Sequence, residues 1–103
     1  MRLNKLVRDK VPDILEKKGK TVRTHTAKRK EYKKLLRNKL KEEVSEYLRD
    51  GSPEELVDPL EIIYALADMD GVTKGKLEKL RKEKAEDRGS FDEGTVLEEV
   101  KDD

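Results

Sequence analysis

The stretch KLKEEVSEYLRDGSPEELVD, residues 39–58, decides how this chain folds. Apolar residues recur at helical spacing up to Asp50, Gly51 interrupts the pattern, and Ser52-Pro53 begins a second one. Two helices joined by so short a connection are expected to lie antiparallel and side by side. The stretch also raises a question, because it sets carboxylates where such helices normally bury apolar side chains.

The first helix is predicted from about Ala27 to Asp50. Gly51 would end it, since glycine readily adopts the left-handed conformation found at helix C-termini. Its apolar side chains form one stripe, with Leu48 at the edge. The residues of this stripe are Tyr32, Leu36, Leu40, Val44 and Tyr47.

The second helix has a start signal in which Ser52 caps, Pro53 takes the first position and Glu55 reaches back to complete a capping box. Pro59 lacks a backbone N–H and clashes with the preceding turn, so a kink or a restart is expected there. The helix then continues through its apolar positions, which are Leu56, Leu60, Ile63, Tyr64 and Ala67.

Short elements are predicted before this helical pair. VPDILEKKG, residues 11–19, predicts a brief helix, with Pro12 near its start and Gly19 past its end. TVRTHT, residues 21–26, is rich in β-branched side chains and predicts a short extended segment or arm.

The chain after the pair predicts one more helix and a tail. Thr73 would cap a basic helix that runs to about Asp87 and ends at Gly89. Residues 95–97 predict a brief extended piece in the tail.

The composition limits the size of the core. Of 103 residues, 33% are hydrophobic, 4% aromatic and 48% charged. We therefore expect one domain over residues 1–103, an all-α helical bundle with a long central helix, a short N-terminal arm and a C-terminal tail. Because short chains hide little of their surface, the bundle is expected to be completed as a homodimer or higher homo-oligomer.

Two absences in the sequence predict the compartment. There is no cysteine, which suits a reducing environment and excludes thiolate metal sites. No apolar run approaches the roughly 18 residues of a membrane span. We expect a cytoplasmic protein without a membrane partner.

Charge is unevenly distributed along the chain. Residues 1–41 hold 16 Lys/Arg and 4 Asp/Glu, a balance of +12, whereas residues 42–73 hold 1 and 10, a balance of −9. Folding could bring the two blocks together, as in an acidic metal site flanked by cations for phosphates.

The acids of the first helix lie on or near its apolar stripe. With Leu36 set to 0°, Glu43 falls at about −20°, Glu46 at about −80° and Glu42 at about −120°. A carboxylate inside an apolar stripe needs a cation or a raised pKa. On the second helix, Glu55 shares a face with Pro59 and Ile62, and Asp58 lies beside that face.

An antiparallel pair could bring Glu43 and Glu46 opposite Glu55 and Asp58. Four oxygen donors without cysteine or convergent histidine suit a hard cation, Mg²⁺ or Mn²⁺, and Glu61 could be a fifth ligand or position a water. The competing interpretation is that these acids pair with Lys and Arg on a solvated surface. Spacing alone leaves both open.

Several motifs resemble those of the all-α nucleotide pyrophosphohydrolases, the MazG-like and phosphoribosyl-ATP pyrophosphohydrolase-like group. Glu42-Glu43-x-x-Glu46 followed by Glu55-x-x-Asp58 is similar to the EExxE…ExxD signature of that group. The resemblance also covers NKLVRDKVP at residues 4–12, ELVDPLEIIYAL at 55–66 and KAEDRGSF at 84–91.

The resemblance implies an α-helical oligomer that uses Mg²⁺ to hydrolyse a nucleoside triphosphate, or phosphoribosyl-ATP, between the α and β phosphates. The metal ligands would be Glu43, Glu46, Glu55 and Asp58. Glu42 and Glu61 would be supporting acids, and Glu43 or Glu46 would accept the proton of the attacking water. The cations nearest the phosphates would be Arg8, Lys10, Lys84 and Arg88, although each also has potential acidic partners or a favourable helix-end position.

Two other functions stay open. The basic tract THTAKRKEYKKLLRNKLK, residues 24–41, favours a nucleic-acid-binding module, but the acids from Glu42 to Asp70 would repel a phosphate backbone, so nucleic acid is not the expected partner. The chain could also be an inactive helical oligomer whose acids merely pair with its cations.

Overall fold

A computed structural model describes residues 4–102, and every regular element within that range is helical. In chain order the elements are α1 (Val11–Lys17), α2 (Arg29–Asp50), the 3₁₀ helix η1 (Pro53–Leu56), α3 (Val57–Met69) and α4 (Lys74–Arg88). The predicted all-α class is confirmed. The extended pieces predicted at residues 21–26 and 95–97 form no strand, because an isolated extended segment has no neighbour with which to pair its backbone.

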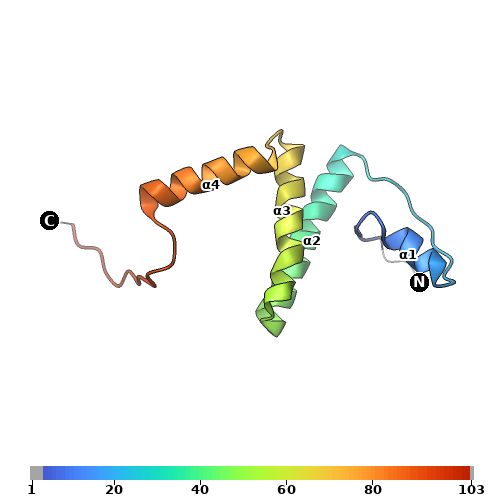
Figure 1. Cartoon of the computed structure of the whole chain (residues 1–103), viewed down its shortest axis with the longest axis horizontal. Helices are drawn as coiled ribbons and strands as arrows, with labels where there is room; N and C mark the ends of the chain where they lie inside the picture. The colour runs from blue at the N-terminus through green and yellow to red at the C-terminus, as the bar shows by residue number, and fades with distance from the viewer. Residues whose placement is uncertain (1–3, 103) are drawn as a thin grey trace.

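Helices α2 and α3 run antiparallel and side by side, while α1 and α4 lie on opposite sides of this pair (Figure 1). The chain measures 66 × 32 × 23 Å, with a radius of gyration of 18.5 Å. A compact domain of this length has a radius of gyration of about 13 Å. The single chain is therefore an open arrangement built around one helical pair.

Helix α2 ends as the sequence predicts. Gly51 takes the left-handed conformation, with φ 70°, and its N–H donates to the carbonyl of Tyr47 at 2.7 Å. At its other end α2 begins at Arg29, two residues after the predicted start. The interior of the helix is rich in Leu, Lys, Glu and Arg, which have high helix propensity.

The start of the second helical segment differs from the capping box that we predicted. The Ser52 side chain makes no capping hydrogen bond; instead, the N–H of Glu55 donates to the Ser52 backbone carbonyl at 3.0 Å. This bond closes a 3₁₀ turn, η1, with Pro53 at its first position. The expected restart occurs at Val57, which places Pro59 in the first turn of α3, where a missing N–H breaks no helical bond.

The flanking helices match their predicted signals. Pro12 lies in the first turn of α1, and the N–H of Gly19 closes its end on the carbonyl of Glu16. The side chain of Thr73 caps α4 by accepting from the N–H of Lys76 at 3.1 Å, and Gly89 ends that helix.

The core is small and is centred on the contact between α2 and α3. Leu36 is 3% exposed and Ile62 is 8% exposed, and Pro59 is buried with them. Val44, predicted on the apolar stripe, is 39% exposed, whereas Glu43 is only 6% exposed. The buried face of α2 is thus rotated from the apolar stripe toward its acids.

Candidate metal and phosphate site

Three glutamates of α2 converge beside α3. Glu42, Glu43 and Glu46 each offer a carboxylate oxygen, and these oxygens all lie within 4.8 Å of one another. Their spacing explains the convergence, since residues three and four apart lie on the same side of a helix. We call Glu42, Glu43 and Glu46 the glutamate cluster.

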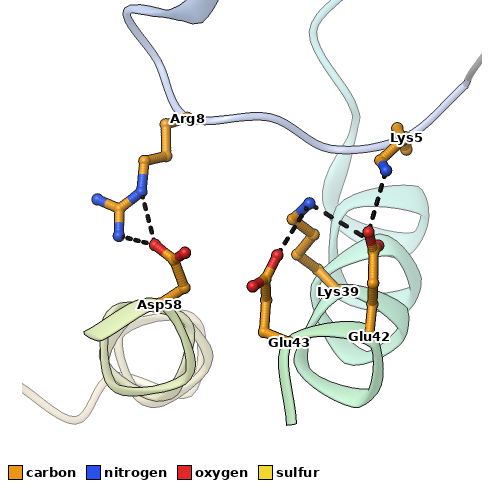
Figure 2. Close-up of polar contacts among 6 residues, drawn as sticks. All are labelled: Lys5, Arg8, Lys39, Glu42, Glu43 and Asp58. Atoms are coloured by element: carbon orange, nitrogen blue, oxygen red, sulfur yellow. Dashed lines mark hydrogen bonds and ion pairs between the residues drawn. The ribbon is translucent and has the colours of Figure 1, made fainter. Parts of the chain in front are cut away.

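Asp58 extends the acidic surface across the helical pair. Figure 2 shows Glu42, Glu43 and Asp58 pointing toward the same side, where the segment that carries Lys5 and Arg8 crosses above them. Asp58 comes from the first turn of α3, which the restart after η1 sets opposite α2. Asp58 therefore faces the cluster without belonging to its closest group of oxygens.

Cations pair with the acids on both sides of this surface. Lys39 Nζ lies 3.3 Å from Glu43 Oε1 and 3.7 Å from Glu42 Oε2. Lys5 Nζ donates to Glu42 Oε1 at 3.0 Å. Together, Lys5 and Lys39 neutralise the N-terminal part of the cluster (Figure 2).

Arg8 holds the other side. Its Nε donates to Asp58 Oδ1 at 3.1 Å, and its Nη2 donates to the same oxygen. This hydrogen bonding raises the pKa of Arg8, and the nearby charges of Glu61 and Glu43 raise it further. Arg8 therefore lies within the electrostatic field of the acids on both helices.

The carboxylates of the cluster respond differently to these neighbours. The hydrogen bond from Lys5 lowers the pKa of Glu42, and Lys39 acts in the same direction. The pKa of Glu46 is raised, first by its hydrogen bond with Glu43, then by the charge of Glu43, and by the charge of Glu55 as well. The negative charges of Glu43 and Glu55 therefore outweigh the effect of the cations near Glu46.

The predicted site residues are brought together only in part. Glu43 and Glu46 converge as expected, and Glu42, predicted as a supporting acid, converges with them. Glu55 is close enough to raise the pKa of Glu46, while Asp58 is bound by Arg8. Hence the four predicted metal ligands surround one region but do not form a single tight group.

The predicted phosphate-binding cations divide into two sets. Arg8 reaches the acidic surface, and Glu61 contributes to the charge around it. Lys84 and Arg88 belong to the C-terminal end of α4, which extends away from the α2–α3 pair (Figure 1). Lys10 is exposed next to the start of α1, and within residues 4–102 it makes no ion pair with a carboxylate.

Sequence reasoning missed Lys5 and Lys39 as partners of the acids. The i,i+4 spacing of Lys39 and Glu43 could have indicated their pairing. Lys5 offered no such signal, because it lies 37 residues from Glu42 along the chain.

The donor set suits a hard divalent cation. Two ligand oxygens on opposite sides of Mg²⁺ lie about 4.2 Å apart, given a metal–oxygen distance of about 2.1 Å. The oxygens of the glutamate cluster lie no more than 4.8 Å from one another, a limit of the same order as this separation. They are carboxylates only, which favours Mg²⁺ or Mn²⁺ over softer metals.

Comparison of the chain with family models, with curated proteins and with solved structures gave no match. Within residues 4–102, none of the helices combines the length and the apolar character needed to cross a bilayer.

Proposed function

We propose that this chain is a metal-dependent nucleotide pyrophosphohydrolase, which cleaves a nucleoside triphosphate or phosphoribosyl-ATP between the α and β phosphates. The observation that carries the proposal is the convergence of Glu42, Glu43 and Glu46, with Asp58 facing them, beneath a segment that bears Lys5 and Arg8. The motif resemblance described above supplies the reaction class.

The glutamate cluster would hold Mg²⁺ or Mn²⁺, with Asp58 and Glu55 completing the ligand set from the facing segments. When bound, the metal supplies activation of a water and stabilisation of the negative charge on the phosphates. Glu61, near Arg8, would support the site from its edge.

The chain's own residues would perform the remaining tasks. Glu43 or Glu46 accepts the proton of the water that attacks phosphorus. Arg8 turns from Asp58 toward the substrate phosphates and positions them. The phosphoanhydride bond then breaks, releasing a nucleoside monophosphate and pyrophosphate.

Three further cations would bind the substrate phosphates. They are Lys10, Lys84 and Arg88. Since α4 extends away from the glutamate cluster, Lys84 and Arg88 would serve the site of a second copy of the chain or would require α4 to move. Lys10 follows Arg8 closely in sequence and would add positive charge near the incoming nucleotide.

A homodimer is the second part of the proposal. Helix α3 is apolar around most of its circumference, yet Leu60 is 48% exposed and Ile63 is 40% exposed on the side away from the core. A helix that is apolar on all sides is normally buried on all sides. A second copy of the chain would cover this face and close the open arrangement into a bundle.

A cytoplasmic location remains a prediction from the cysteine-free sequence.

The activity is tested by measuring pyrophosphate release from a panel of nucleoside triphosphates and phosphoribosyl-ATP with Mg²⁺ or Mn²⁺. Glu43→Gln should lower turnover by about 100-fold or more, since it removes a metal ligand and a candidate base. Asp58→Asn should also lower turnover, because it removes the proposed metal ligand that faces the cluster from α3.

The matched control for both variants is Glu78→Gln on α4. It removes one carboxylate that pairs with Arg81, away from the cluster, and should leave turnover unchanged. If no substrate yields pyrophosphate and no metal binds, the chain is instead a helical binding or scaffold protein. Turnover that survives in folded Glu43→Gln would remove the cluster from the mechanism.

A further inference from the structure

The outer face of α2 carries a row of cations that the proposed hydrolase site does not use. Taking Leu36 as 0°, its members all fall between about 100° and about 160° around the helix. They line a shallow hollow of ≈ 430 Å³ together with Asn38. We call this row the cationic row; its members are Lys30, Lys34, Arg37 and Lys41.

The cations of the row have no acidic partners, unlike Lys5 and Lys39, which pair with the glutamate cluster. Within residues 4–102, no carboxylate lies within 4.0 Å of any charged group of the row. All four side chains are exposed. Like charges one turn apart destabilise a helix, so a polyanion that lies along the row would relieve a repulsion built into the fold.

The fold also turns the buried acid of α2, Glu43, away from the row. Glu43 lies about 160° around the helix from Lys41. Glu42 lies about 100° from Lys41, and its charge is offset by Lys5, as that of Glu43 is by Lys39. The repulsion of a phosphate backbone by the acids that follow the basic tract is therefore reduced on this face, because Glu43 points away from it and Glu42 is paired.

We propose that the cationic row binds the phosphate backbone of a nucleic-acid duplex, without reading its sequence. The row spans about 16.5 Å along the helix axis from Lys30 to Lys41, which is long enough to meet several successive phosphates. Contacts of this kind set position and affinity but carry no sequence information.

The surroundings of the row favour a duplex over two other polyanions. Single-strand binders stack bases on aromatic side chains, but Tyr32, the aromatic residue of this tract, lies half-buried on the other face of α2. Helices that bind anionic membranes insert apolar side chains beside their cations. Between Lys30 and Lys41 no large hydrophobic side chain is exposed, and the exposed ones of α2, Val44 and Leu48, follow the last member of the row.

The test is the salt dependence of binding to a short fluorescent DNA duplex, followed by anisotropy. With four phosphate contacts, log K should fall against log salt with a slope of about −3.6, so affinity should drop about 150-fold between about 50 and about 200 mM salt. The triple variant Lys34→Gln, Arg37→Gln, Lys41→Gln keeps one cation of the row. Its slope should be about −0.9, a drop of about 3.5-fold over the same range.

A matched variant separates the row from net charge. Lys76→Gln, Lys79→Gln, Lys82→Gln removes the same charge from α4 and should keep the steep slope. Glu43→Gln should keep it as well, because the row acts independently of the hydrolase site.

Three results would overturn the proposal. They are absence of duplex binding by the wild-type chain, equal losses in the two triple variants, and tighter binding to vesicles of anionic lipid than to the duplex. Circular dichroism of each variant establishes that α2 remains helical, so that a loss of binding reports the charges and not the fold.

Discussion

Glu43 combines burial and charge more sharply than any other residue between 4 and 102. Its side chain is 6% exposed, yet its identified cationic contact is the single ion pair with Lys39 at 3.3 Å. A buried carboxylate is costly unless it is paired and hydrogen-bonded. Lys39 offsets part of this cost, and the proposed metal ion would offset more of it.

Glu46 allows the repulsion within the cluster to be measured directly. The folded chain raises the pKa of Glu46, chiefly through Glu43. An acid whose pKa is raised on folding weakens the fold once it is ionised, so stability is lost as the pH rises through that pKa. Glu46→Gln should therefore raise the melting temperature at pH 7 in the absence of metal, and the difference should vanish below about pH 4, where the glutamate is protonated.

Thermal melts at several pH values provide this measurement, with Glu83→Gln on α4 as the control that should show no such trend. Added Mn²⁺ should reverse the order, because it stabilises the wild-type cluster more than the variant. An unchanged or lower melting temperature for Glu46→Gln at pH 7 would contradict the repulsion between Glu46 and Glu43.

Arg8 and a metal ion are expected to compete for Asp58. Removing the guanidinium frees Asp58 and lowers the positive charge near Glu43. Arg8→Gln should therefore bind Mn²⁺ up to about fivefold more tightly without nucleotide, the scale set by a single exposed ion pair. The same variant should raise KM for the nucleotide, since Arg8 also positions the phosphates.

Calorimetric titration with Mn²⁺ measures the first effect, and steady-state kinetics measures the second. Arg23→Gln, in the exposed segment before α2, removes an equal charge elsewhere and should change neither quantity. Weaker Mn²⁺ binding by Arg8→Gln would mean that Arg8 organises the acids and does not compete with the metal.

At the scale of elements, two glycines of similar exposure should respond oppositely to alanine. Gly51 ends α2 with φ 70°, and an added Cβ there would meet nothing within 4 Å. The cost of Gly51→Ala is thus conformational, about 1–2 kcal/mol. Gly75 lies inside α4 without a positive φ, so Gly75→Ala should stabilise by up to about 1 kcal/mol.

Urea denaturation followed by circular dichroism checks both substitutions. The pair serves as its own control, because each replaces a glycine by an alanine at a position that leaves room for the new methyl group. The same sign for both would show that the turn after α2 is not held in the left-handed conformation.

At the scale of the whole molecule, the open shape and the exposed face of α3 predict self-association. Leu60→Glu places a charge in the proposed interface and should weaken the dimer by about 30-fold or more, because burying an unpaired charge is costly. Leu97→Glu, in the 78%-exposed position of the C-terminal segment, is the control and should leave the dimer intact. Sedimentation equilibrium measures both, and a monomeric wild type at high concentration would contradict the prediction.

The sequence alone determined the helices and most of their ends. Gly51, Thr73 and Gly89 act within their own turns, so their effects can be predicted from local rules. The capping box at Ser52 failed because a backbone carbonyl accepted the hydrogen bond instead. The convergence of Glu43 and Glu46 was also predictable, since it depends only on their spacing along one helix.

The tertiary structure decided which charges meet and which face is buried. Arg8 and Asp58 are 50 residues apart, and Lys5 and Glu42 are 37 apart, so no local pattern relates them. Packing against α3 turned α2 so that Glu43 is buried and Val44 is exposed, and it left the cationic row on the opposite side. The reason is physical: helix formation depends on neighbours within a turn, whereas burial and charge pairing depend on distances set only once separate segments pack together.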